Sequence, residues 1–219
     1  MQINCAIFDF DGTLFDSMYI WDELAITYLK TLHKVAKPSL LSDIQTMSLL
    51  ESSQYLKNEY DLDLSVNEIM EGITKTMEDF YRFEIQPKAG VQDFLECLKQ
   101  KHVHMCIATA SDHTLVEAAL KRCHLDGYFE AIFTCSEYGC NKNEPTLFRE
   151  AMHFFNSTRN QTIVFEDALH AVQTAKKDHF MTVGVYDSSE PNSNQLKNIS
   201  DCYLESFLET ENFWKFVNF

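Results

Sequence analysis

Two aspartates separated by one residue follow the first apolar stretch of the chain. Residues 3–8 are typical of a buried strand, and the sequence DFDGT (residues 9–13) comes directly after them. Alternation along an extended chain points Asp9 and Asp11 the same way, and Gly12 allows a sharp turn. Paired carboxylates suit the binding of hard cations, nucleophilic attack and proton transfer. Taken alone, the run could equally be an acidic turn that caps a helix.

A hydroxyl-bearing segment follows a second apolar stretch, residues 104–109. Thr109, Ala110 and Ser111 close this predicted strand and open a predicted helix. A hydroxyl and unpaired backbone amides at such a point can hold a phosphate group. The other interpretation is that the hydroxyl only caps the helix.

A lysine and an acidic pair complete the set of candidates. Lys142 precedes a predicted helix and could neutralise phosphate oxygens, or it could simply be solvated. Glu166 and Asp167 end the apolar stretch at residues 162–165. Two acids at the carboxyl end of a strand could hold a metal ion, or they could cap the next helix.

Short apolar stretches alternate with helical patterns along most of the chain. The predicted strands are residues 3–8, 104–109, 131–135, 162–165 and 181–185, and the predicted helices are residues 91–101, 111–123, 146–155 and 168–178. Such alternation predicts an α/β fold with a parallel sheet that is covered on both faces. Ligands bind beyond the carboxyl ends of the strands in such sheets.

The segment between the first two strands is far longer than a crossover connection needs. Apolar residues recur with a helical period from Ile20 to Leu32, behind a possible cap at Asp16 or Ser17. Capping boxes are expected at residues 42–45 and 65–68. We therefore expect a helical insertion over residues 15–85, in a core formed by residues 1–14 and 86–219.

Composition limits the possible partners. The 219 residues carry a formal net charge of −15, which disfavours nucleic acid and anionic membranes. No apolar run approaches the roughly 20 residues that span a bilayer, and the N-terminal sequence does not look like a signal peptide. The seven cysteines are scattered and mostly lie in apolar stretches. We expect reduced cysteines and a cytoplasmic protein.

The candidate residues, in this order, resemble the four motifs of the haloacid dehalogenase superfamily. These motifs are DxDGT, a threonine or serine after the second strand, a lysine before a helix, and an acidic pair after the fourth strand. The resemblance covers the whole chain and is greatest to the subgroup of phosphoglycolate phosphatases and β-phosphoglucomutase. It implies a Rossmann-like sheet of strand order 3-2-1-4-5, with a helical cap inserted after the first motif.

The resemblance also implies roles in catalysis. Asp9 would attack phosphorus and form an aspartyl-phosphate, while Asp11 would protonate the leaving oxygen and later activate water. Thr109, the backbone amide of Ala110, and Lys142 would hold the transferring phosphoryl group. Catalysis would then rest on positioning and on neutralisation of charge.

A Mg²⁺ cofactor is implied in the same way. Asp9, the backbone carbonyl of Asp11, and Asp167 would bind the ion, and Glu166 would support it through water. The chain departs from the family at His170 and His179, where relatives commonly have glycine. If His179 is left-handed, the substitution costs roughly 1 kcal/mol.

The expected activity is hydrolysis of a small phosphorylated metabolite by a monomer. A sugar-phosphate mutase and an inactive phosphate-binding protein are the alternatives. β-Phosphoglucomutase carries a histidine at the position of Trp21, and Lys57 is the single Lys or Arg in residues 40–60. Because a mutase needs a second phosphate site, both features favour a phosphatase.

Overall fold

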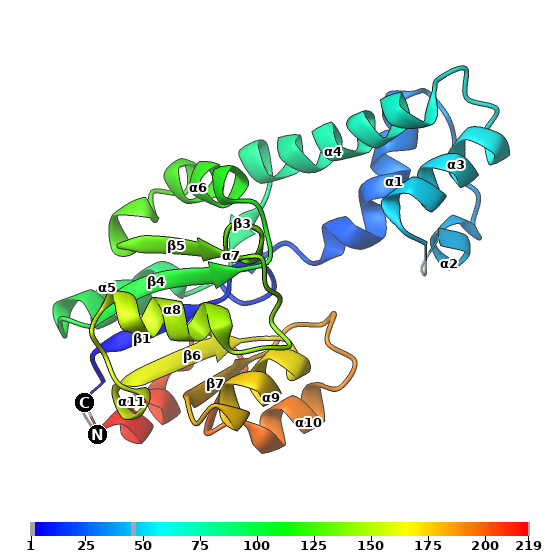
Figure 1. The fold of residues 1–219 in the computed structure, drawn as a ribbon. Helices are drawn as coiled ribbons and strands as arrows, with labels where there is room; N and C mark the ends of the chain where they lie inside the picture. The colour runs from blue at the N-terminus through cyan, green and yellow to red at the C-terminus, as the bar shows by residue number, and fades with distance from the viewer. Residues whose placement is uncertain (1–2, 45–46, 219) are drawn as a thin grey trace. The chain divides into compact units, whose positions relative to one another are not determined.

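The chain divides into two compact units. The computed structural model describes residues 3–44 and 47–218, with only the backbone at Trp21 and Asp22 (Figure 1). One unit, which we call the sheet unit, comprises Met1–Ser17 and Ile85–Phe219. The other, the helical unit, comprises Met18–Glu84. Each unit is described by itself.

A six-stranded parallel sheet forms the centre of the sheet unit. Its strand order is β5-β4-β1-β6-β7-β8. The strands are β1 (Cys5–Phe8), β4 (His104–Thr109), β5 (Ala131–Thr134), β6 (Thr162–Glu166), β7 (Met181–Val185) and β8 (Cys202–Leu204). The first five in the chain confirm the predicted order 3-2-1-4-5. The short β8, which pairs with β7, was not predicted.

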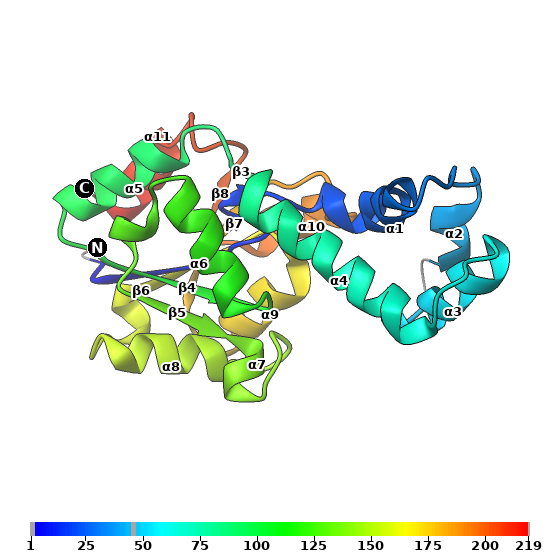
Figure 2. The same cartoon turned by 90° about the horizontal axis from the view of Figure 1, so that it is seen from above.

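Helices cover both faces of this sheet (Figure 2). They are α5 (Val91–Gln100), α6 (His113–Arg122), α7 (Cys135–Tyr138), α8 (Thr146–Phe154), α9 (Leu169–Lys177), α10 (Ser193–Ile199) and α11 (Glu211–Val217). One face packs against α8 and α9 through Ile7, Phe148 and Ala171. On the other face Phe8 stacks on Phe165, with ring centroids 4.3 Å apart. The sheet is therefore a buried central layer, as its continuous apolar strands predict.

A two-stranded antiparallel ribbon lies where the chain leaves and re-enters the sheet unit. Its strands are β2 (Phe15–Asp16) and β3 (Gln86–Pro87). The Lys88 amide extends the pairing by donating to the Leu14 carbonyl at 2.8 Å. The ribbon therefore pairs the two segments that connect the sheet unit to the helical unit, and its first strand begins four residues after Asp11 in the sequence.

The helical unit contains four helices among its described residues. They are α1 (Tyr19–Thr31), α2 (Leu40–Ile44), α3 (Leu49–Glu59) and α4 (Val66–Phe83). The predicted capping box of Ser65 and Glu68 at the start of α4 is confirmed. The prediction at residue 42 is wrong, because Ser42 lies inside α2 and donates to the Ser39 carbonyl. Its proposed partner Gln45 lies outside the described residues. The capping box before α3 is instead formed by Ser48 and Glu51.

None of the helices in residues 3–44 and 47–218 has both the length and the apolar character needed to cross a membrane.

Candidate active site

The sheet order places the predicted residues at one edge. Strand β1 lies between β4 and β6, in parallel with both. Asp9, Thr109 and Asp167 therefore stand at or just beyond three neighbouring carboxyl ends. The Asp9 amide donates to the Phe165 carbonyl at 3.0 Å, which ties the start of the loop to β6. Gly12 then turns the chain with φ 74°.

A buried lysine joins two of the acids. Lys142 donates through Nζ to Asp9 Oδ1 and, at 2.6 Å, to Glu166 Oε1. All three side chains are buried, Glu166 completely. Burial would lower the pKa of Lys142, but the Asp9 and Glu166 carboxylates raise it above its ordinary value. The lysine is therefore held as a cation at the carboxyl ends of β1 and β6.

The acids outnumber this cation. Asp9, Glu166 and Asp167 each offer a carboxylate oxygen, and these atoms lie within 4.8 Å of one another. Burial raises the pKa of Glu166 to about 7, although Lys142 opposes the shift. The pKa of Asp167 is also raised, by burial and then by the charges of Asp9 and Glu166. Three buried carboxylates beside one ammonium form an all-oxygen donor set with excess negative charge, which fits a hard divalent cation.

Asp167 is held from a second side. The Thr13 hydroxyl donates to Asp167 Oδ1 at 2.8 Å. Thr13 belongs to the DFDGT run, so this bond links the first motif to the last across 154 residues of sequence. Glu166, expected to support a metal through water, has Lys142 as its direct partner.

Two serines hold the second aspartate. Ser17 Oγ donates to Asp11 Oδ1 at 2.6 Å, and Ser111 Oγ donates to Asp11 Oδ2 at 2.5 Å. The expectation that Asp16 or Ser17 caps α1 is wrong, since Met18 occupies that position without a side-chain cap. Ser17 instead orients Asp11. Sequence reasoning missed both serine contacts, although each serine lies next to a motif.

The Thr109 hydroxyl accepts a hydrogen bond from the segment that follows it. Thr109 is buried, and its Oγ1 accepts from the Ser111 amide at 3.0 Å. Ala110 is exposed. Helix α6 is capped by Asp112, whose carboxylate accepts from the Thr114 amide at 2.8 Å. Capping is thus performed by Asp112, which leaves Thr109 and Ala110 at the carboxyl end of β4, beside the Asp9 loop.

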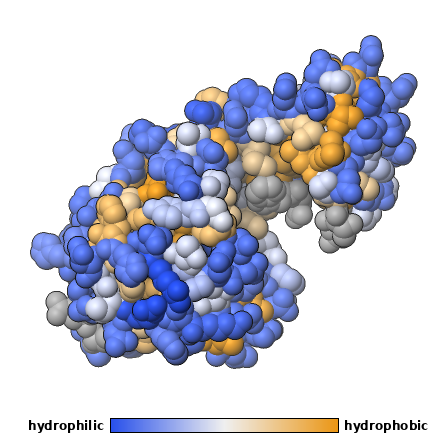
Figure 3. Space-filling view, in the orientation of Figure 1, coloured by the Kyte–Doolittle hydropathy of each residue, from blue (hydrophilic) through white to orange (hydrophobic). Residues whose placement is uncertain are grey.

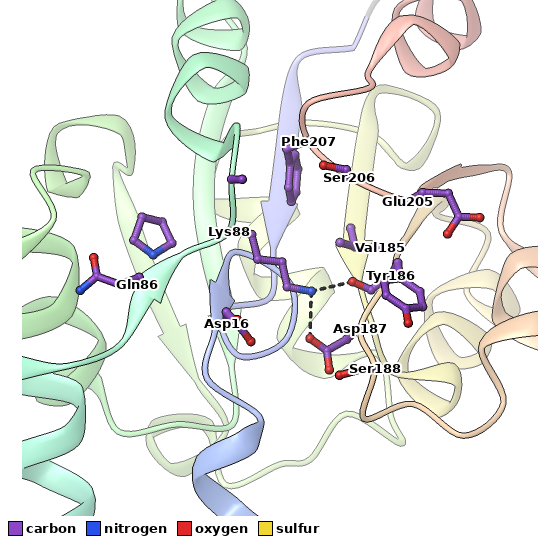
Figure 4. Close-up of a pocket in the computed structure, with 12 residues that line it drawn as sticks. Asp16, Gln86, Lys88, Val185, Tyr186, Asp187, Ser188, Glu205, Ser206 and Phe207 are labelled. Atoms are coloured by element: carbon purple, nitrogen blue, oxygen red, sulfur yellow. Dashed lines mark hydrogen bonds and ion pairs between the residues drawn. The ribbon is translucent and has the colours of Figure 1, made fainter.

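A second lysine stabilises the base of that loop. Lys88 Nζ donates to the Tyr186 carbonyl at 2.6 Å and pairs with Asp187 Oδ2 at 2.9 Å (Figure 4). These residues line a pocket of about 320 Å³ beside the β2–β3 ribbon. Because the Lys88 amide also bonds Leu14, this residue connects the end of the Asp9 loop to the end of β7. No motif in the sequence indicated this contact.

The helical unit has an apolar groove of its own, of about 440 Å³. Its lining includes Leu24, Leu41, Leu56 and Met77, and hydrophobic residues are visible on this unit in Figure 3. Lys57 does not line it, and its Nζ donates to the Leu64 carbonyl within the same unit. The side chain of Trp21 lies outside the described part of the chain.

Comparison with known proteins identifies the family. The sequence matches the family described as haloacid dehalogenase-like hydrolase over residues 6–185. It is 22% identical over 177 residues to a phosphorylated carbohydrates phosphatase of Thermotoga maritima, with 80% of this chain and 81% of that protein covered. It is also 22% identical over 212 residues to a provisionally assigned pyrophosphatase PpaX of Caldanaerobacter subterraneus, with 94% and 91% covered.

The fold agrees with this family. A crystal structure from Thermotoga maritima, provisionally assigned as a β-phosphoglucomutase, superposes with a TM-score of 0.84 at 21% identity. The alignment covers 97% of this chain and 99% of that one. At this identity the likeness shows the fold. The family match, which spans most of the chain, shows that the protein belongs to the haloacid dehalogenase-like hydrolases, as the four motifs predicted.

Proposed function

We propose that this protein is a Mg²⁺-dependent phosphatase that hydrolyses a small phosphorylated metabolite through an aspartyl-phosphate on Asp9. The observation that carries the proposal is the buried Lys142, bonded to both Asp9 and Glu166. An ammonium held against the attacking carboxylate is suited to neutralise phosphoryl oxygens. The enzyme class is phosphoric monoester hydrolase, in accord with the family and with the phosphatase names of its relatives.

The chain's own residues account for both chemical steps. A carboxylate oxygen of Asp9 attacks phosphorus, the bond from phosphorus to the ester oxygen breaks, and Asp11 donates a proton to the departing oxygen. Asp11 then takes a proton from water, whose oxygen attacks phosphorus and releases inorganic phosphate and free Asp9. The two serine hydroxyls on Asp11 fix its carboxyl group for both transfers.

Three groups would position the phosphoryl group, and the acids would hold the metal. The Thr109 hydroxyl, the Ala110 amide and the Lys142 ammonium would contact its oxygens. Asp9, the Asp11 carbonyl and Asp167 would hold Mg²⁺, with Glu166 in support, and the ion supplies charge neutralisation when bound. We further propose that the helical unit is a cap domain that selects the substrate, and that the protein is a cytoplasmic monomer.

Phosphorus NMR separates hydrolysis from phosphoryl transfer. We expect inorganic phosphate to accumulate from members of a panel of phosphorylated metabolites with Mg²⁺. With β-glucose 1-phosphate we expect no glucose 6-phosphate. A mutase needs a cation to hold the second phosphate, and Lys57, the one Lys or Arg in residues 40–60, already donates to the Leu64 carbonyl. A growing glucose 6-phosphate signal would establish a mutase instead. Absence of turnover across the whole panel, with the protein folded and Mg²⁺ bound, would favour an inactive phosphate-binding protein.

A further inference from the structure

Two cysteines lie in the loop that leads to Lys142. Cys135 begins the short helix α7, and Cys140 follows it after Gly139. Gly139 is left-handed with φ 60°, and the Cys140 amide donates to the Cys135 carbonyl at 3.1 Å. This bond between residues i+5 and i is the one found in Schellman motifs, in which the side chains of these two positions frequently touch.

The two cysteines belong to the same region of the core. Cys135 is part of the core cluster under α8, and Cys140 packs against that cluster from its rim. Burial raises the pKa of the Cys135 thiol to about 11, and the neighbouring Cys140 thiol adds to this shift. The backbone bond therefore brings together two thiols of one short loop, and Cys140 is the half-buried one.

We propose that Cys135 and Cys140 are a reversible oxidation site whose disulfide inhibits the enzyme by displacing Lys142. Cys140 is only two residues from Lys142, and no regular element lies between them. A bond that draws Cys140 onto α7 acts directly on the turn that carries the lysine. A misplacement of about 1 Å at a catalytic group can cost about 10²-fold in rate. The coupling to Lys142 rests on the proposed function, whereas the disulfide itself does not.

A hydroperoxide is the oxidant that the chemistry requires. The Cys140 sulfur attacks one oxygen of hydrogen peroxide, the O–O bond breaks, and water leaves with the thiol proton as a sulfenic acid forms. The Cys135 sulfur then attacks the Cys140 sulfur, the S–O bond breaks, and a second water carries away the Cys135 proton. The two thiols lose two electrons and two protons, and one peroxide becomes two waters.

The order of attack follows from exposure. Cys140 is half-buried in a loop whose neighbours Tyr138, Gly139 and Asn141 are exposed, so peroxide can reach it. Cys5 and Cys106 are also neighbours, on β1 and β4, but both are completely buried within the sheet. The exposure of Cys140 therefore distinguishes this pair from Cys5 and Cys106.

Peptide mapping of the full-length protein tests the disulfide without reference to catalysis. After treatment with hydrogen peroxide, we expect a peptide that contains residues 135 and 140 to lose two hydrogens and to recover them with dithiothreitol. Cys140→Ser should abolish this change, while Cys97→Ser, at an exposed cysteine on α5, should leave it intact. Oxidation confined to Cys97, with residues 135 and 140 still reduced, would overturn the proposal.

Turnover of a phosphate ester tests the coupling to Lys142. We expect peroxide to lower kcat at least about tenfold in the wild type and in Cys97→Ser, with recovery on reduction. Cys140→Ser should keep its untreated activity in peroxide. A disulfide that forms fully while kcat is unchanged would overturn the inhibition. If no substrate is ever turned over, peptide mapping still decides the oxidation site, so the two failures remain distinguishable.

Discussion

At the scale of single residues, the site depends on one cation surrounded by acids. Lys142 pairs with Asp9 and Glu166, while Asp167 relies on the Thr13 hydroxyl as its hydrogen-bond partner. Buried like charges repel strongly, so such a cluster is costly for stability and useful for chemistry. Changing one acid should therefore affect activity far more than folding.

Asp9→Asn tests the role of the nucleophile. The amide keeps the shape of the side chain but removes the attacking charge, so turnover of p-nitrophenyl phosphate should fall by at least ~10³, or about 4 kcal/mol in transition-state stabilisation. The melting temperature should change little, because two effects oppose each other. Loss of the Asp9 charge relieves repulsion from Glu166 and Asp167, and it also removes an ion-pair partner of Lys142. Asp16→Asn, at an exposed aspartate of β2, is the matched control and should retain activity. Near wild-type turnover by Asp9→Asn would exclude the covalent mechanism.

The sequence was informative about some of these residues and silent about others. Asp9, Thr109, Lys142 and Asp167 each follow a strand or precede a helix, so parallel topology alone brings them to one edge. Ser17 is different, because a hydroxyl before a helix can either cap it or bind another partner. Only the folded loop shows that it binds Asp11.

At the scale of elements, the corner after α9 is stabilised and strained at once. Asp178 accepts from Arg149 Nε at 2.8 Å and from Arg159 at 3.0 Å, and these contacts lower the pKa of its carboxyl group. The next residue, His179, is left-handed with φ 64°, which is the conformation in which a Cβ is costly. The Phe180 amide then donates to the Ala175 carbonyl at 3.0 Å and closes the helix.

His179→Gly should stabilise the protein. Glycine adopts a left-handed conformation without the steric cost of a Cβ, so we expect a gain of about 0.5–1 kcal/mol, or about 2–3 °C in melting temperature. Turnover should be unchanged, because His179 lies at the opposite end of α9 from the catalytic edge. His153→Gly, at an exposed position within α8, is the control and should destabilise by a similar amount. Equal destabilisation by both variants would show that the left-handed corner is not strained.

Most elements followed from periodicity, and the misses share a physical cause. The five long strands are continuous apolar runs, which a parallel sheet requires. Strand β8 has three residues, and the β2–β3 ribbon has two in each strand, so neither is long enough to show a period. The capping box of Ser48 and Glu51 was not predicted, and the one predicted at Ser42 fails because Ser42 lies inside α2.

At the scale of the whole molecule, a net charge of −15 opposes both folding and the approach of phosphate esters. The buried acids of the site add to this repulsion. A divalent cation would relieve this repulsion locally, so metal binding should stabilise the fold as well as support activity.

We expect activity to be lost in EDTA, restored by Mg²⁺ and inhibited by Ca²⁺, whose larger and looser coordination would misplace Asp9.

The stability of the metal-free protein should depend on pH in the sense set by Glu166 and Asp167. Their pKa values are raised in the folded state, that of Glu166 to about 7, while unfolded carboxyl groups titrate near 4. Between these values the folded protein holds protons that the unfolded chain has released, so the free energy of unfolding rises as pH falls from about 8 toward 5. At pH 8, Mg²⁺ should stabilise the folded protein in place of these protons, because it neutralises the ionised acids.

Thermal unfolding of wild type and Asp167→Asn isolates this contribution from the other titrating groups. In EDTA at pH 8, Asp167→Asn should melt above the wild type, by roughly 1–2 kcal/mol or about 3–6 °C, because a buried negative charge is removed while Thr13 can still donate to the amide oxygen. That difference should shrink as the pH falls, because the raised pKa of the wild-type carboxyl group favours its neutral form. Added Mg²⁺ should raise the melting temperature of the wild type but not of the variant. If Mg²⁺ raises both equally, the ion binds elsewhere, and Asp9, Glu166 and Asp167 are not its site.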